Sequence, residues 1–130
     1  MKSKYNARKT IVVDGSLIKS GTALFKSTAQ KIRVGEIDGI IFDSYHEAEY
    51  YLYLYQQRKE GRIDAFERQV RFDLIPSQKG ERPVFYKADF VTWRRGERLD
   101  VIDCKGMRLP VYVIKRKLML QVHGIKIKEV

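Results

Sequence analysis

Three residues in the stretch 86–106 have side chains that could bind a cation and act on a phosphate ester: Asp89, Asp103 and Lys105. The stretch predicts two extended segments joined by an Arg-Arg-Gly-Glu turn. Because side chains alternate along a strand, Asp103 and Lys105 point to one face and Cys104 to the other. Carboxylate oxygens suit a hard divalent cation, which completes its shell with water and phosphate oxygens. A lysine beside such a cation would assist the cleavage of a phosphodiester.

A metal-free arrangement also fits these three residues. Asp89 lies in an otherwise apolar segment, where a carboxylate is costly to bury without a partner, and a salt bridge to Lys105 would supply one. Asp103 would then be a second acid at the same place with no cation to balance it. We therefore favour a metal site over a simple ion pair between Asp89 and Lys105.

A helix is predicted upstream of this stretch. Ser44-Tyr-His-Glu47 is a capping-box pattern, and apolar and aromatic residues follow it at helical spacing until Gly61. The helix is expected from about Tyr45 to Glu60. Glu47, in its first turn, either closes the capping box or reaches toward the cation or its water. Three nearby carboxylates could take the place of Glu47: Asp43, Glu49 and Asp73.

Strands and a second helix are predicted after this helix. Alternating residues indicate three antiparallel strands at 66–75, 84–93 and 98–104, and a terminal strand at 125–130. The helix between the last two strands makes a crossover connection. The final strand is therefore expected to lie parallel to its partner in a mixed sheet.

The second helix has recognisable ends and an apolar stripe. Pro110 suits its first turn, and His123-Gly124 is a typical C-terminal signal. A helix of this kind packs its apolar stripe on the core. The stripe consists of Val111, Ile114, Leu118 and Val122.

The composition indicates one domain with a polyanionic partner. The chain has 130 residues, enough to bury a core without disulfides. Its 26 Lys and Arg against 16 Asp and Glu give a formal charge of +10, which favours nucleic acid because basic side chains neutralise phosphates. The single cysteine forms no internal disulfide, and no apolar run reaches membrane-spanning length. We expect a cytoplasmic protein that binds neither a membrane nor an organic cofactor.

Three parts are expected within this domain. Residues 1–10 are polar and basic and predict a flexible arm. Residues 11–37 form an N-terminal addition, either a β-ribbon or a loop with a short helix. Asp-Gly turn signals at 14–15 and 38–39 accompany its short apolar segments. Residues 38–130 form the core.

These residues resemble the PD-(D/E)XK nuclease superfamily. The likeness rests on Asp89, on Asp103-Cys-Lys105 and on Glu47 upstream in a helix, in a basic chain. The local sequences Tyr86-Lys-Ala-Asp-Phe90 and Lys115-Arg-Lys-Leu118 are also similar to those of a poorly characterised phage-associated family within this superfamily. The resemblance implies a restriction-endonuclease-like core, an α/β fold with a mixed sheet, in the order α-β-β-β-α-β after an N-terminal extension. The proline of the motif's name is absent, which removes no ligand.

The resemblance also implies roles for individual residues. Asp89 and Asp103 would bind Mg²⁺ or Mn²⁺, with the backbone carbonyl of Cys104 as an extra ligand. Glu47 would support a metal-bound water or a second ion. Lys105 would orient or deprotonate the attacking water, or stabilise negative charge in the transition state.

Further residues are expected around this centre. Gln69 and Tyr86 would support the ligands or face DNA. The basic run 115–117 either follows DNA phosphates or is a solvated helix face. The residues expected to bind DNA are Arg94, Arg95, Lys115, Arg116 and Lys117.

The function implied is a metal-dependent DNA endonuclease that hydrolyses phosphodiesters and leaves a 5′-phosphate and a 3′-hydroxyl. Branched DNA, such as a Holliday junction in phage recombination or replication, is the expected substrate by analogy with small phage members. Symmetrical cutting of two strands would call for a homodimer. Two alternatives stay open: a basic nucleic-acid-binding module without catalysis, and an inactive structural member of the same fold.

Overall fold

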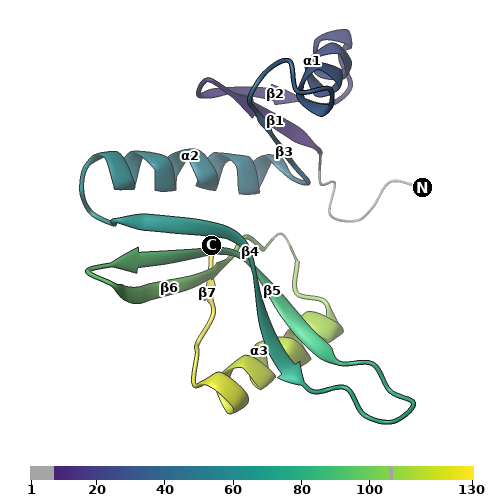
Figure 1. Cartoon of the computed structure of the whole chain (residues 1–130), viewed down its shortest axis with the longest axis vertical. Helices are drawn as coiled ribbons and strands as arrows, with labels where there is room; N and C mark the ends of the chain where they lie inside the picture. Colours follow the sequence, from purple (N-terminus) through teal and green to yellow (C-terminus); the bar gives the residue numbers. More distant parts are fainter. Residues whose placement is uncertain (1–7, 106) are drawn as a thin grey trace. The chain divides into compact units, whose positions relative to one another are not determined.

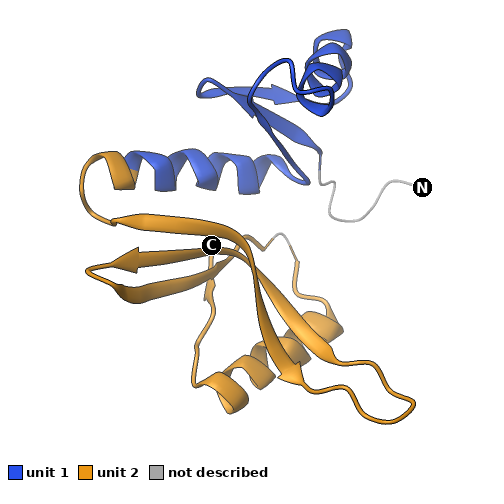
Figure 2. Cartoon of the chain, viewed as in Figure 1, with its two compact units in different colours: residues 1–56 blue, residues 57–130 orange. Residues whose placement is uncertain are grey.

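The structure is a computed structural model that describes residues 8–105 and 107–130. It combines α and β structure, as expected, with two sheets and three helices in this part of the chain (Figure 1). The chain divides into two compact units, residues 1–56 and 57–130 (Figure 2). The division falls inside a helix, whereas the sequence placed the start of the core at residue 38. Most of the predicted arm, 1–10, lies outside the described residues.

The first unit is built on a small antiparallel sheet in the order β2-β1-β3. Its strands are β1 (Thr10–Val13), β2 (Ser16–Lys19) and β3 (Ile40–Phe42). Asp14 and Gly15 form the turn between β1 and β2, with φ of 48° and 78°. Both angles are positive, as a two-residue hairpin turn requires. The predicted Asp-Gly turn is therefore confirmed, and a ribbon is present.

Helix α1 (Ala23–Arg33) follows the hairpin. Thr22 caps it, because its hydroxyl accepts a hydrogen bond from the N–H of Phe25 at 3.1 Å. Gly39, just before β3, allows α1 and the sheet to approach closely. A Cβ at this position would lie 2.6 Å from Cδ1 of Ile32 and 2.9 Å from Cγ2 of Val13. The addition is thus a folded element with its own packing.

Helix α2 (Tyr45–Lys59) confirms the helix predicted at 45–60. Ser44 caps it, since its Oγ accepts a hydrogen bond from the N–H of Glu47 at 3.1 Å. The division between the two units falls after Gln56, within the last turns of α2. No helix in residues 8–105 and 107–130 is long and apolar enough to cross a membrane.

The second unit contains a four-stranded sheet in the order β4-β5-β6-β7. The first three strands form the predicted antiparallel meander, and β7 runs parallel to β6 as predicted. The terminal strand is shorter than expected, with two residues instead of six. The bounds are β4 (Ala65–Ile75), β5 (Val84–Arg94), β6 (Glu97–Asp103) and β7 (Lys128–Glu129).

Helix α3 (Pro110–His123) makes the crossover between β6 and β7. Gly124 ends it in the left-handed conformation, with φ of 67°. The residues it buries are Tyr112 and Met119, at 7% and 0% exposure. These two residues are seven apart, two helical turns, and join the core cluster with Tyr86 and Val101.

The predicted apolar stripe of α3 is wrong for most of its length. Val111, Ile114 and Val122 are 63%, 58% and 49% exposed, and only Leu118 packs against the core. The pattern of aliphatic residues predicts this stripe, which does not include Tyr112. In the fold, the aromatic ring of Tyr112 covers more of the sheet than Val111 would. The packed face is therefore rotated by about one residue around the helix.

Strands β4 and β5 are irregular where Gln69 and Asp89 lie opposite each other. The core cluster includes both Ala88 and Val91, which a regular strand would put on opposite faces. Gln69 has a φ of 52°, which a side chain other than glycine rarely adopts in a strand. Figure 1 shows β4 turning sharply near its middle. The pairing register between β4 and β5 is the same on both sides of Gln69, so the irregularity is local to this residue.

The backbone at Gln69 leads to a first prediction. Replacing Gln69 with valine should destabilise the protein by about 1–2 kcal/mol, because a β-branched side chain is strongly disfavoured at positive φ. Glu67→Val on the same strand is the matched control, and a strand-favouring residue there should cost less than about 0.5 kcal/mol. Urea unfolding measures both. Equal effects of the two variants would contradict the assignment of strain to Gln69.

Candidate active site

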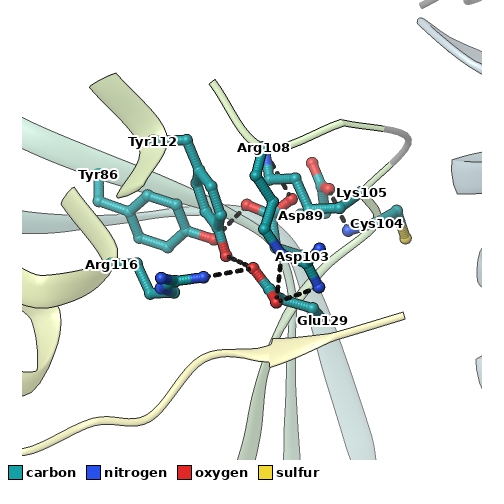
Figure 3. A network of polar contacts seen from close by, with 9 residues as sticks. All are labelled: Tyr86, Asp89, Asp103, Cys104, Lys105, Arg108, Tyr112, Arg116 and Glu129. Carbon is teal, nitrogen blue, oxygen red and sulfur yellow. Dashed lines mark hydrogen bonds and ion pairs between the residues drawn. The ribbon is translucent and has the colours of Figure 1, made fainter. Parts of the chain in front are cut away.

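Three carboxylates lie in a row across β5, β6 and β7. Asp89 and Asp103 each adjoin the cross-strand pair of Phe90 and Ile102, so they are neighbours on adjacent strands. Asp103 is in turn the cross-strand partner of Glu129. Adjacent strands are about 4.8 Å apart, which brings the three acids to one level of the sheet. Figure 3 shows them together.

Asp103 is buried and holds two partners. It is 4% exposed, accepts a hydrogen bond from the hydroxyl of Tyr86 at 2.5 Å, and pairs with the Nζ of Lys105 at 3.0 Å. Burial and the charge of Asp103 raise the pKa of Tyr86, so this hydroxyl keeps its proton and donates it. Tyr86, expected near the site, is therefore in contact with a predicted ligand.

Asp89 is held by the backbone and by an amide. Its Oδ2 accepts a hydrogen bond from the N–H of Cys104 at 2.8 Å, and the side chain of Gln69 also donates to it. Burial raises the pKa of Asp89 to about 6, and the charge of Asp103 adds to this. The bonds from Cys104 and Gln69 and the charge of Lys105 act in the opposite direction.

Lys105 does not form the metal-free pair with Asp89 that we considered from the sequence. Its Nζ pairs with Asp103 and lies 3.8 Å from the centre of the Tyr112 ring. One ammonium thus stands beside two carboxylates. The charges of Asp89, Asp103 and Lys105 sum to a single negative charge when both acids are ionised, which is the condition that attracts a further cation.

The carboxylates present suit a metal ion that takes few protein ligands and keeps several waters. Among the described residues, no group of three or more His, Cys, Asp or Glu side chains has a geometry that could hold a metal ion. Two carboxylates are enough for Mg²⁺, which usually keeps several waters and binds substrate phosphates. The sulfur of Cys104 points away from both carboxylates (Figure 3), so of Cys104 only its carbonyl is left as a ligand.

Glu47 belongs to the first unit, whereas the other proposed ligands belong to the second. It is buried, at 7% exposure, and its backbone N–H is capped by Ser44. This bond confirms Ser44 as the N-cap, and closure of the capping box by the Glu47 carboxylate stays a prediction. A role for its carboxylate beside Asp89 and Asp103 stays a prediction.

The residues expected to bind DNA are spread over the second unit. Arg94 and Arg95 lie at the turn between β5 and β6, at the far end of this hairpin from Asp103. The N–H of Arg95 donates to Asp64. On α3, Lys117 is exposed, and the Nζ of Lys115 lies 5.7 Å from the Phe85 ring centre. Only Arg116 reaches the network of Figure 3.

The sequence did not point to three members of that network: Arg108, Tyr112 and Glu129. Glu129 pairs with Arg108 at 2.9 Å, and it accepts a hydrogen bond from the hydroxyl of Tyr112 at 2.7 Å. The bonds from Arg108 and Tyr112 lower the pKa of Glu129 to about 2. Burial raises the pKa of Tyr112, and its bond to Glu129 adds to this.

A signal for Glu129 was present in the alternation of the last segment. In a strand, the side chain of Glu129 lies on the same face as those of Ile125 and Ile127, and Ile127 is buried. An acid in register with buried apolar residues needs a partner inside the fold. No comparable signal marks Arg108 in the sequence.

A comparison with known families places the chain. Residues 24–129 match the model of a family described as "Protein of unknown function (DUF1064)". The chain belongs to this family. No curated protein and no solved structure matches it. The DUF1064 match contains every candidate site residue from Glu47 to Glu129. It also begins within α1, a helix that the sequence placed outside the core.

The position of Asp89 leads to a prediction on pH. Its pKa of about 6 in the fold lies above the ordinary value of 3.8, so ionisation of Asp89 opposes folding in the absence of a cation. Relative to Asp89→Asn, the wild type should lose on the order of 2 kcal/mol as the pH rises from about 4 to about 7. Urea unfolding in EDTA across this range measures the difference.

The matched control for this experiment is Asp73→Asn, since the Asp73 side chain is 78% exposed. The effect of this variant on stability should be much smaller than that of Asp89→Asn, because an ion pair at an exposed side chain contributes little. If the stability of the wild type relative to Asp89→Asn does not change with pH, the pKa of Asp89 is not raised in the fold.

Proposed function

We propose that this DUF1064 protein is a metal-dependent endodeoxyribonuclease that hydrolyses phosphodiester bonds. The observation that carries the proposal is the pairing of Asp89 and Asp103 on adjacent strands, with a single ammonium, that of Lys105, 3.0 Å from Asp103. Two acids and one lysine at one level of a sheet are suited to a divalent cation and an incoming phosphate.

The order of the elements supports the resemblance to PD-(D/E)XK nucleases. From α2 to β7 the chain runs α-β-β-β-α-β, with three antiparallel strands and a fourth parallel to the third. This is the order that the resemblance implies for a restriction-endonuclease-like core. The formal charge of +10 further supports a polyanionic substrate.

Asp89 and Asp103 would hold Mg²⁺, or Mn²⁺ in its place, with the carbonyl of Cys104 as an extra ligand and Glu47 acting through water or a second ion. A bound divalent cation supplies a water of lowered pKa and neutralises charge on the phosphate. Lys105, held by Asp103 and the Tyr112 ring, would orient the attacking water or stabilise charge on the phosphate. Gln69 and Tyr86 would keep the two carboxylates in place.

The proposed substrate is branched DNA such as a Holliday junction in phage recombination or replication. This choice rests on analogy with small phage-associated nucleases. Symmetrical cutting of two strands would need two copies of the site, so we propose a homodimer acting in the cytoplasm of a bacterial host.

One observation favours a non-catalytic alternative. Asp103 already has polar partners in Lys105 and Tyr86, so it does not need a metal ion to avoid being left unpaired. A basic module that binds nucleic acid without cutting it would keep such a cluster for structure alone.

Cleavage distinguishes the two functions. A four-way junction, a 5′ flap and a linear duplex of matched sequence are incubated with wild type and Asp103→Asn, in Mg²⁺, Mn²⁺ and EDTA. We expect metal-dependent cutting by the wild type, strongest on the junction, and a loss of at least about 100-fold in the variant, because it removes a charge next to the reacting phosphate. Binding without cutting by the wild type would favour the non-catalytic module.

Thermal unfolding tests the metal site without any substrate. Mn²⁺ or Mg²⁺ should raise the melting temperature of the wild type by several degrees, because a ligand that binds only the folded state adds about 2.7 kcal/mol at 100 times its Kd. Asp89→Asn and Asp103→Asn should lose the shift, while Glu97→Gln, at an exposed position at the other end of β6 from Asp103, keeps it. The same shift in all four proteins would place the metal elsewhere.

A further inference from the structure

Two arginines converge on the carboxylate of Glu129. The Nε and NH2 of Arg108 lie 3.0 and 2.9 Å from its Oε1, and NH1 of Arg116 lies 3.4 Å from its Oε2. The hydroxyl of Tyr112 donates to the same Oε2 at 2.7 Å. These three side chains are all donors, and both carboxylate oxygens of Glu129 are engaged, so we do not assign Glu129 a metal.

The arginines lie beside the candidate active site. Glu129 is the cross-strand partner of Asp103, and the ring of Tyr112 is shared between the two clusters. Lys105 lies over this ring at 3.8 Å from its centre, and Arg116 at 6.0 Å. Figure 3 shows the guanidinium groups of Arg108 and Arg116 on either side of the Glu129 carboxylate.

The charges around Glu129 do not balance. Two guanidinium groups stand against one carboxylate, which leaves one positive charge in excess. A guanidinium has five N–H donors, and Arg108 uses those of two nitrogens on Glu129. The side chains of Arg108 and Arg116 are 59% and 35% exposed, so their other donors are accessible.

We propose that Arg108 and Arg116, oriented by Glu129, bind a phosphate of the DNA backbone next to the phosphodiester that is cut. This inference rests on the proposed nuclease function and deepens it. An arginine whose fork is already fixed by a carboxylate loses little side-chain entropy when it binds a phosphate. Glu129 is then a positioning residue for two phosphate-binding side chains.

DNA binding in EDTA tests the site without cleavage. Arg108→Gln and Arg116→Gln are compared with the wild type on a four-way junction and a matched duplex, over a range of salt concentrations. Each variant should bind roughly 10-fold more weakly at low salt, and the slope of log K against log salt should fall by about 1 for each phosphate that the variant no longer binds. The matched control is Arg62→Gln, an exposed arginine that also pairs with a glutamate, Glu60.

A second pair of variants separates phosphate binding from structure. Arg108→Lys keeps the charge without the fork, so it should retain the salt slope while binding more weakly than the wild type. Glu129→Gln removes the carboxylate that holds both guanidinium groups but keeps both positive charges, so it should bind more weakly than the wild type with an unchanged salt slope. Urea unfolding of each variant reports folding separately.

The proposal is overturned if Arg108→Gln and Arg116→Gln bind DNA with the affinity and salt slope of the wild type, or if Arg62→Gln weakens binding as much. In the first case the cluster only joins α3 to β7. If the wild type cuts DNA in Mg²⁺ under the same outcome, the nuclease function stands and only the phosphate site fails. A wild type that neither binds nor cuts DNA would overturn both.

Discussion

The candidate site depends on the cost of placing two carboxylates on adjacent strands with one lysine, which pairs with Asp103. Like charges at this distance oppose ionisation, and burial adds to the effect at Asp89. Four neighbouring groups offset this cost. Lys105 and Tyr86 act on Asp103, whereas the N–H of Cys104 and the amide of Gln69 act on Asp89. The set is held together without being neutralised, which leaves it suited to a cation.

Strand β7 holds the backbone of Asp103 and Lys105 through hydrogen bonds beyond its own two residues. The N–H of Val130 donates to the carbonyl of Asp103 at 3.0 Å, and the N–H of Lys105 donates to the carbonyl of Val130 at 3.1 Å. These bonds extend the parallel pairing past the end of β6 and fix the backbone that carries Asp103 and Lys105. The crossover through α3 brings Tyr112 over the same place, where its ring meets Lys105 and its hydroxyl meets Glu129.

The break at Gln69 shows a local conflict that serves the site. A regular β4 would keep its backbone extended opposite Asp89, yet Gln69 has a positive φ. Strain of this kind persists where the surrounding contacts determine the backbone more strongly than local preference does. Here the contacts are the bond from Gln69 to Asp89 and the core packing of Ala88 and Val91 on one side of the sheet.

The sequence by itself determined most of the local elements, and it pointed to Asp89, Asp103 and Lys105 as residues that could do chemistry. Capping and periodicity placed α2, the meander, both ends of α3 and the parallel last strand, because these signals depend on neighbouring residues. The tertiary structure alone decided which face of α3 is buried and that Lys105 pairs with Asp103. It also decided that Arg108, Tyr112 and Glu129 meet. These contacts join residues far apart in the chain, and they follow from packing and register across strands, which no local pattern encodes.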